Sequence, residues 1–282
     1  MLGKLMKHEF RATARIMLPV MGAMVALALL ANLSIRGLAG NLSDIPMLRI
    51  LFVLIIIFFS VAVVATIVMS LVIMVSRFYR NLLKDEGYLM FTLPVSVHEL
   101  IWSKLIVSLV WFLATALLIF LVMSLMALNL SHTNLEMILE QLPSWSEINH
   151  WLDETGIRGQ LVTLLIQVVL GTLIGIFAAC LHFYAAMGLG QMSANHKGLM
   201  SVLAFIGISI AFRIILSGVS AGMIQSGAME TFFLGLEEAP GISEAFSMLH
   251  KIALGTLLLS LIQSAVLYVP TVFGLKKGLN LG

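Results

Sequence analysis

"RILFVLIIIFFSVAVVATIVMSLVIMVSR", residues 49–77, contains no charged residue between its first and last arginine. A helix needs about 20 apolar residues to cross the hydrocarbon core of a bilayer, which is about 30 Å thick. This stretch exceeds that length and has no polar interruption stronger than serine or threonine. It therefore predicts a membrane-spanning helix.

The rest of the chain has the same character. Hydrophobic residues make up 60% of the 282 residues and charged residues 11%, with a mean hydropathy of +1.07. Soluble domains carry about 25% charged residues. Segments that cross lipid must be helical unless they belong to a closed barrel, and the alternating segments of a barrel are absent. The sequence predicts an all-α integral membrane protein, with residues 1–282 in one membrane domain and six spans at about 16–35, 48–76, 105–130, 161–187, 199–223 and 252–275.

The charges between these spans predict the orientation. One side of the membrane receives eleven bases and four acids, and the opposite side receives four bases and ten acids. The basic side is predicted to be cytoplasmic by the positive-inside rule. Both termini then lie in the cytoplasm, and the protein is expected to be a multi-pass protein of the cell membrane.

Residues 2–15 have an amphipathic helical pattern. Leu2, Leu5 and Phe10 share one face with Met6, while the basic residues can meet anionic headgroups. We predict an interfacial helix on the inner surface. Two roles fit it equally: an anchor that orients the first span, or a contact for a partner.

Two S/T-x-x-E capping boxes occur in the predicted outer loop 131–160. Thr133 with Glu136 and Ser144 with Glu147 each predict the start of a short helix. Trp151 follows in the second helix, and tryptophan favours the membrane–water boundary. We expect both helices to rest on the outer surface.

Signatures of catalysis are absent from the sequence. It has no G-x-x-x-x-G-K-[ST] phosphate-binding loop, no H-E-x-x-H and no G-x-S-x-G. Glu237 and Glu238 resemble a paired acidic site, but only His182 lies well inside a span, where a histidine is usually a packing residue. Metal ligands are scattered, and the single cysteine, Cys180, permits no disulfide within the chain. We expect neither an enzyme nor a nucleic-acid partner.

A short polar segment, "KDEGYLMFTLP" at 84–94, separates the second and third predicted spans. Gly87 is suited to end a helix, and Pro94 prevents continuation of the apolar turns that follow it. Ser96 and Glu99 form a third capping box. The pattern predicts helix, break, short transverse helix, break and helix. Two interpretations fit it: a docking corner for a soluble partner, or a well-capped tight turn.

The stretch "RFYRNLLKDEGYLMFTLPVSVHELIWSKLI", with the six spans and the basic N-terminal helix, resembles the permease subunits of bacterial type-2 ABC exporters. The match is most specific to small permeases with D-E-G-Y-L-x-x-T-L-P in this loop, and it is confined to about residues 77–104. The resemblance implies that the short helix is a coupling helix that docks on a separate P-loop ATPase, which would bind ATP and magnesium. It implies a second permease chain, identical or different. By the same resemblance, the residues that contact the ATPase are Lys84, Asp85, Glu86, Gly87, Tyr88 and Leu89.

The family also places short re-entrant helices between its last two spans, and residues 227–241 have a suitable length, with glycines and Pro240. The mechanism that the resemblance implies is alternating access. ATP hydrolysis in the partner would move the corner, and spans two and three would tilt with it.

Arg213 is the one charged residue well inside a predicted span. Such a residue usually faces a bundle interior or a water-filled cavity. Two roles remain open: it lines a translocation path, or it forms a structural ion pair with Glu230, Glu237 or Glu238 or extends outward to the interface.

Two small-residue patterns indicate close helix packing. Gly171 with Gly175 and Gly218 with Gly222 each have the G-x-x-x-G spacing. Packing within the chain and packing between two chains both fit them.

The sequence-based hypothesis is the membrane-spanning subunit of an ATP-driven exporter. The methionine and phenylalanine content favours an apolar or amphipathic substrate such as a lipid, a drug or an antimicrobial peptide. A secondary transporter and a non-transporting scaffold or sensor subunit are the alternatives. The former predicts ionisable groups inside the spans and often an inverted repeat.

Overall fold

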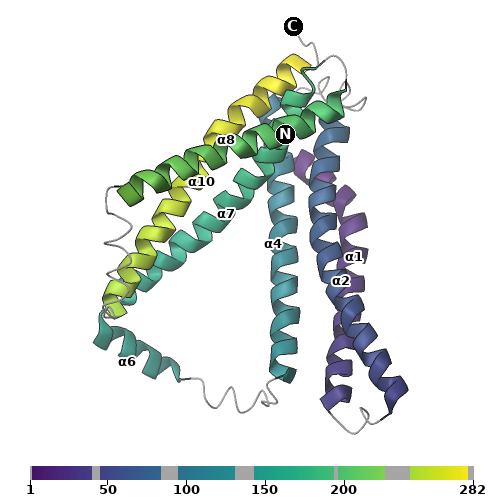
Figure 1. Cartoon of the computed structure of the whole chain (residues 1–282), viewed down its shortest axis with the longest axis vertical. Coiled ribbons are helices and arrows are strands. Elements are labelled where there is room, and N and C mark those ends of the chain that lie inside the picture. Colours follow the sequence, from purple (N-terminus) through teal and green to yellow (C-terminus); the bar gives the residue numbers. More distant parts are fainter. Residues whose placement is uncertain are drawn as a thin grey trace. The chain divides into compact units, whose positions relative to one another are not determined.

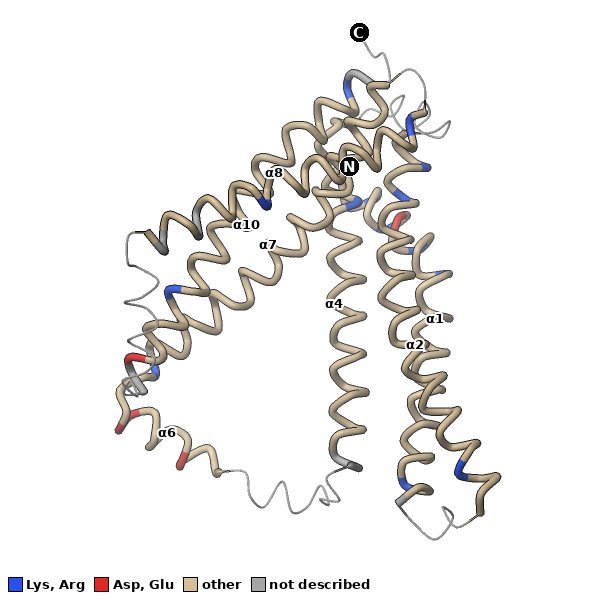
Figure 2. Tube along the Cα trace, viewed as in Figure 1, with Lys and Arg blue, Asp and Glu red and all other residues tan. Residues whose placement is uncertain are grey.

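A computed structural model describes the chain at residues 2–39, 45–83, 95–130, 143–193, 196–225 and 242–278. Within these ranges the chain is helical apart from short turns and helix ends, and no strand occurs. Among the described residues, six helices are long and apolar enough to cross a membrane, as predicted for an all-α membrane protein with six spans. Lys, Arg, Asp and Glu gather mainly toward the helix ends, and long central stretches carry none of them (Figure 2).

The described helices extend beyond the predicted apolar blocks. This extension arises because polar flanking residues continue the same backbone hydrogen bonding beyond the apolar block. The elements are α1 (Leu2–Ala39), α2 (Pro46–Phe78), the π-helix η2 (Tyr79–Leu83), α4 (Val97–Leu130), α6 (Trp145–Thr155), α7 (Arg158–Gly190), α8 (Lys197–Gln225) and α10 (Ile242–Gly278) (Figure 1).

The chain divides into two compact units. The first comprises Met1–Arg77 and His98–Leu142, and the second comprises Phe78–Val97 and Pro143–Gly282. The division falls within α2, whose last residue, Phe78, belongs to the second unit.

The first unit consists of α1, α2 up to Arg77, and α4 from His98. Two apolar clusters lie between its helices. One is centred on Met24, Phe59 and Val122, and the other on Met17 and Trp111. Polar side chains inside the unit hydrogen-bond one another or the backbone. The hydroxyl oxygens of Ser70 and Thr115 lie 3.1 Å apart, and the Asn32 amide donates to the Leu125 carbonyl oxygen of α4.

The second unit is built on α7, α8 and α10. The chain runs in the same sense through α7 and α10, which approach most closely where Gly188 faces Gly274. A Cβ atom added to Gly274 would lie 2.4 Å from the carbonyl carbon of Gly188, so the two backbones meet without side chains between them. Gly190 allows a similar approach between the end of α7 and Ser201 of α8. Close backbone approach at small residues is a common form of packing between membrane helices.

The capping pattern at 144–147 is confirmed. Ser144 accepts a hydrogen bond from the backbone N–H of Glu147, and the Glu147 carboxylate accepts one from the Ser144 N–H. The helix ends at Gly156, whose φ of 66° is left-handed. Helix α4 begins at Val97, directly after Ser96, as the third capping box predicts. The first box, at Thr133 and Glu136, lies outside the described residues.

Candidate functional site

The helix that leads into the 84–94 segment is held tightly at its end. After Phe78, the hydrogen bonding of α2 widens into the π-helix η2, a rare form that often marks functional positions. The Phe78 ring stacks on that of Tyr184 in α7, with centroids 3.9 Å apart and planes 11° from parallel, and both residues are fully buried. Asn81 and Leu82 of η2 are buried as well. A displacement of the chain after Leu83 would therefore act directly on the α7 side of the second unit.

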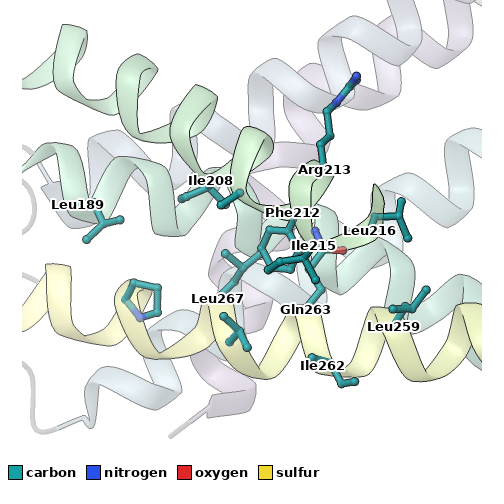
Figure 3. Close-up of a pocket in the computed structure, with 13 residues that line it drawn as sticks. Leu189, Ile208, Phe212, Arg213, Ile215, Leu216, Leu259, Ile262, Gln263 and Leu267 are labelled. Carbon is teal, nitrogen blue, oxygen red and sulfur yellow. The ribbon is translucent and has the colours of Figure 1, made fainter. Parts of the chain in front are cut away.

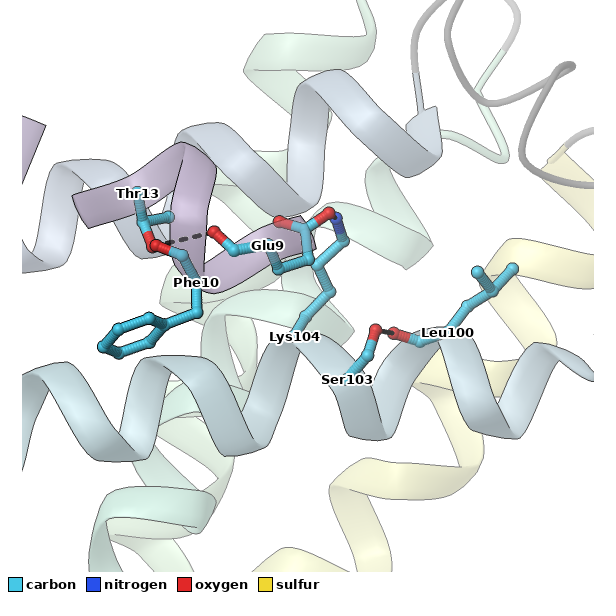
Figure 4. A network of polar contacts seen from close by, with 6 residues as sticks. All are labelled: Glu9, Phe10, Thr13, Leu100, Ser103 and Lys104. Carbon is cyan, nitrogen blue, oxygen red and sulfur yellow. Dashed lines mark hydrogen bonds and ion pairs between the residues drawn. The ribbon is translucent and has the colours of Figure 1, made fainter. Parts of the chain in front are cut away.

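The helix that leaves this segment is also held by buried contacts, within the first unit. Leu100 and Ile101 of α4 have no exposed surface, and Ser103 donates a hydrogen bond to the Leu100 carbonyl oxygen over 2.8 Å. Lys104 forms an ion pair with Glu9 of α1, with side chains only 2% and 8% exposed (Figure 4). A buried ion pair is costly to separate because each charge would remain without its partner.

A second set of contacts lies two turns further along α4. The Trp111 indole N–H donates a hydrogen bond to the Thr13 hydroxyl oxygen over 2.8 Å. Thr13 in turn donates to the Glu9 carbonyl oxygen over 2.9 Å, and the Phe10 ring stacks on Trp111 at 4.9 Å. The contacts that join the N-terminal part of α1 to α4 thus include an ion pair, a hydrogen bond and a ring stack.

The predicted interfacial helix at 2–15 is not a separate element, because it continues without a break into the first span. Its basic residues Lys4, Lys7, Arg11 and Arg15 are exposed, whereas Glu9 and Thr13 are buried on the face that meets α4. The amphipathic pattern predicted from the sequence is therefore present, although the buried face includes polar groups. These polar groups pair with α4.

The predicted docking residues Lys84, Asp85, Glu86, Gly87, Tyr88 and Leu89 lie outside the described residues. The same is true of Pro94, of the predicted re-entrant segment at 227–241 and of the three acids proposed as partners of Arg213.

Arg213 lies on an exposed face of α8 and makes no ion pair with a described residue. Part of it borders a cavity of about 490 Å³ between α7, α8 and α10, within the second unit. Its guanidinium group points away from this cavity (Figure 3). The two roles considered for Arg213, a translocation path and a structural ion pair, stay predictions.

The four glycines of the G-x-x-x-G patterns have open space around them. No described atom outside the local helix lies within 4 Å of a Cβ atom added at Gly171, Gly175, Gly218 or Gly222. In the part of the chain that the structure describes, close contacts occur instead at other glycines, including Gly188 with Gly274 and Gly190 with Ser201.

His182 has the contacts of a packing residue. Its Nε2 lies 3.0 Å from the Ser209 hydroxyl oxygen, and Ser209 donates its own proton to the Phe205 carbonyl oxygen over 2.8 Å. His182 Nε2 must therefore be the donor toward Ser209. The ring also meets Phe205 edge-on at 4.7 Å. Across the described ranges, no three His, Cys, Asp or Glu side chains gather in a group that could hold a metal ion.

Two features were not predicted from the sequence. One is the set of contacts that hold η2 and the start of α4 on either side of the 84–94 segment. The other is Gln263, a polar residue that lines the cavity. The signal for Gln263 was available, since it is an amide inside the predicted span 252–275. The Phe78–Tyr184 and Glu9–Lys104 pairs left no such signal, because their members are far apart in the sequence.

Comparison of the chain with protein-family models, with curated proteins and with solved structures finds no match.

Proposed function

We propose that this chain is the membrane-spanning permease subunit of an ATP-driven exporter. Residues 84–94 form its coupling helix, which docks on a separate cytoplasmic P-loop ATPase that binds ATP and magnesium. Both termini are cytoplasmic, the exposed basic residues at the start of α1 face the inner surface of the cell membrane, and two permease chains form the transport unit. The substrate is apolar or amphipathic.

The observation that supports this proposal is the anchoring of both helices that flank the predicted coupling segment. On one side Phe78 stacks on Tyr184 within the second unit. On the other side Lys104 pairs with Glu9 within the first unit. A simple connecting turn needs neither contact, since good caps alone end and start helices. A segment that transmits force needs both, because a loosely held helix end would absorb the displacement.

The ATPase partner is proposed from the resemblance of this segment to the coupling helix of exporter permeases, and the residue types of the segment suit a docking surface. Lys84, Asp85 and Glu86 provide charges for hydrogen-bonded contacts with a soluble surface, and Tyr88 and Leu89 provide an apolar anchor. Aromatic anchors surrounded by polar groups are typical of protein interfaces. No phosphate-binding loop occurs in the sequence, so the proposal requires ATP hydrolysis in the partner.

The test is co-purification of the full-length chain from its native membrane. We expect a P-loop ATPase to accompany the wild-type chain and to be lost from the variants Glu86→Arg and Gly87→Pro. The matched control is Glu154→Arg, the same charge reversal at an exposed residue of α6 on the opposite predicted side. Retention of the ATPase by both loop variants would refute docking at this segment. Absence of any ATPase from the wild type would favour the scaffold or secondary-transporter alternatives.

A further inference from the structure

The cavity of the second unit is lined almost wholly by aliphatic and aromatic side chains. Ile208, Phe212 and Leu216 of α8 form one wall, and Leu259, Val266 and Leu267 of α10 form the facing wall. Its volume of about 490 Å³ falls within the range of small-molecule sites. Gln263 provides the one polar side chain, other than Arg213, among the residues that line it.

The depth of Gln263 in the membrane follows from its place in α10. It lies twelve residues after Lys251 and thirteen before Lys276. At a rise of 1.5 Å per residue, it is about 18 Å from the first lysine and about 20 Å from the second. Gln263 therefore lies near the middle of the bilayer, where neither water nor lipid headgroups reach an amide.

The Gln263 amide has no hydrogen-bond partner among the described residues. It reaches from α10 toward Ile215 and Leu216 of α8 (Figure 3). An amide without a partner in hydrocarbon is unfavourable by several kcal/mol. Lipid tails can fill an apolar cavity, but they cannot donate or accept a hydrogen bond. The structure thus combines an apolar cavity with one unpaired polar group.

We propose that this cavity binds an uncharged lipophilic molecule that hydrogen-bonds the Gln263 amide through a carbonyl, amide or hydroxyl group. An anionic ligand is disfavoured because the Arg213 guanidinium points away from the cavity (Figure 3). A cationic ligand is disfavoured because no acidic side chain lines it. The aliphatic walls bind the apolar body of the ligand, and the amide selects molecules that have a hydrogen-bonding group. The inference does not depend on the docking of an ATPase.

The test uses two photoreactive probes on the full-length chain in lipid nanodiscs. One is a dodecanoyl N-methylamide that carries a diazirine and an alkyne, and the other is dodecane with the same two groups. Labelled peptides are located by mass spectrometry. We expect saturable labelling of α8 and α10 by the amide probe, and labelling about fivefold weaker in the variant Gln263→Met, as for loss of one net hydrogen bond. Labelling by the hydrocarbon probe should stay unchanged in this variant.

Two further variants separate the site from general lipid contact. Ala211→Phe places a ring in the cavity and should reduce labelling by both probes. Ser264→Ala is the control, because Ser264 is adjacent to Gln263 but does not line the cavity, and its hydroxyl bonds the Ser260 carbonyl oxygen. An equal response of the two probes to Gln263→Met would overturn the inference and indicate a cavity filled by bilayer hydrocarbon. Non-saturable labelling by the amide probe would overturn it as well. Neither outcome would bear on ATPase docking.

Discussion

Replacing Lys104 by methionine should strongly destabilise the first unit. The methionine keeps most of the volume of the lysine stem but leaves the Glu9 carboxylate buried without its cation. With side chains only 2% and 8% exposed, water cannot take the place of the missing partner. Removing one member of a buried ion pair typically costs about 3–5 kcal/mol, and we expect Lys104→Met to fall in this range.

The double variant Glu9→Met, Lys104→Met should be far less damaging. Replacing a buried ion pair by apolar residues of similar size is often neutral, because the cost of removing both charges from water disappears together with their attraction. Both residues make other polar contacts as well, so we expect a net cost of about 0–2 kcal/mol. The double variant should therefore be more stable than either single variant.

The assay is reversible unfolding in mixed micelles of a mild detergent and sodium dodecyl sulfate, followed by tryptophan fluorescence. Trp111 reports on the same helix pair. The exposed ion pair between Asp153 and Arg158 provides the control, with side chains 67% and 49% exposed. Asp153→Asn should change the free energy of unfolding by less than about 1 kcal/mol. The reasoning is refuted if Lys104→Met costs no more than this control, or if the double variant costs the sum of the two singles.

Three further changes test the packing. Gly274→Ala should destabilise the chain by about 1–3 kcal/mol, because the new Cβ would clash with the Gly188 backbone. The matched control is Gly188→Ala, whose new Cβ meets only ordinary contacts at 3.5 Å. Equal free energies of unfolding for the two variants would contradict the close crossing. Thr13→Val removes the acceptor of the Trp111 indole and should cost about 1–3 kcal/mol, and an unchanged tryptophan spectrum would argue against that bond. Ser144→Ala should weaken α6 by about 1 kcal/mol, and unchanged amide exchange there would exclude the cap.

The spans were predictable from the sequence because the bilayer imposes a one-dimensional condition. A helix such as residues 49–77 must be long, apolar and internally hydrogen-bonded, and each of these properties is visible in a single segment. The starts of α4 and α6 were predictable for the same reason, because the capping residues Ser96 and Ser144 lie directly before Val97 and Trp145, the first residues of these helices. Local physics determines these features.

The helix contacts were not predictable in this way. Gly171 and Gly175 have the expected spacing but open space around them, while the close approach uses Gly188 and Gly274, which belong to different helices. Spacing within one helix shows only that a partner can come close. It cannot show which helix is the partner, because that depends on how all the neighbouring side chains fill the space between helices.

The same limit applies to the segment at 84–94, for which the sequence leaves two interpretations, a capped turn and a docking corner. These two interpretations differ in how firmly the flanking helices are held. The residues that hold them are Tyr184, which contacts Phe78, and Glu9, which contacts Lys104, and both are far from the segment along the chain. The chain enters this segment from a helix end packed in the second unit and leaves it into a helix bound within the first. A contact made at 84–94 would therefore act on both units through covalently continuous helices, which a turn with free ends would not allow.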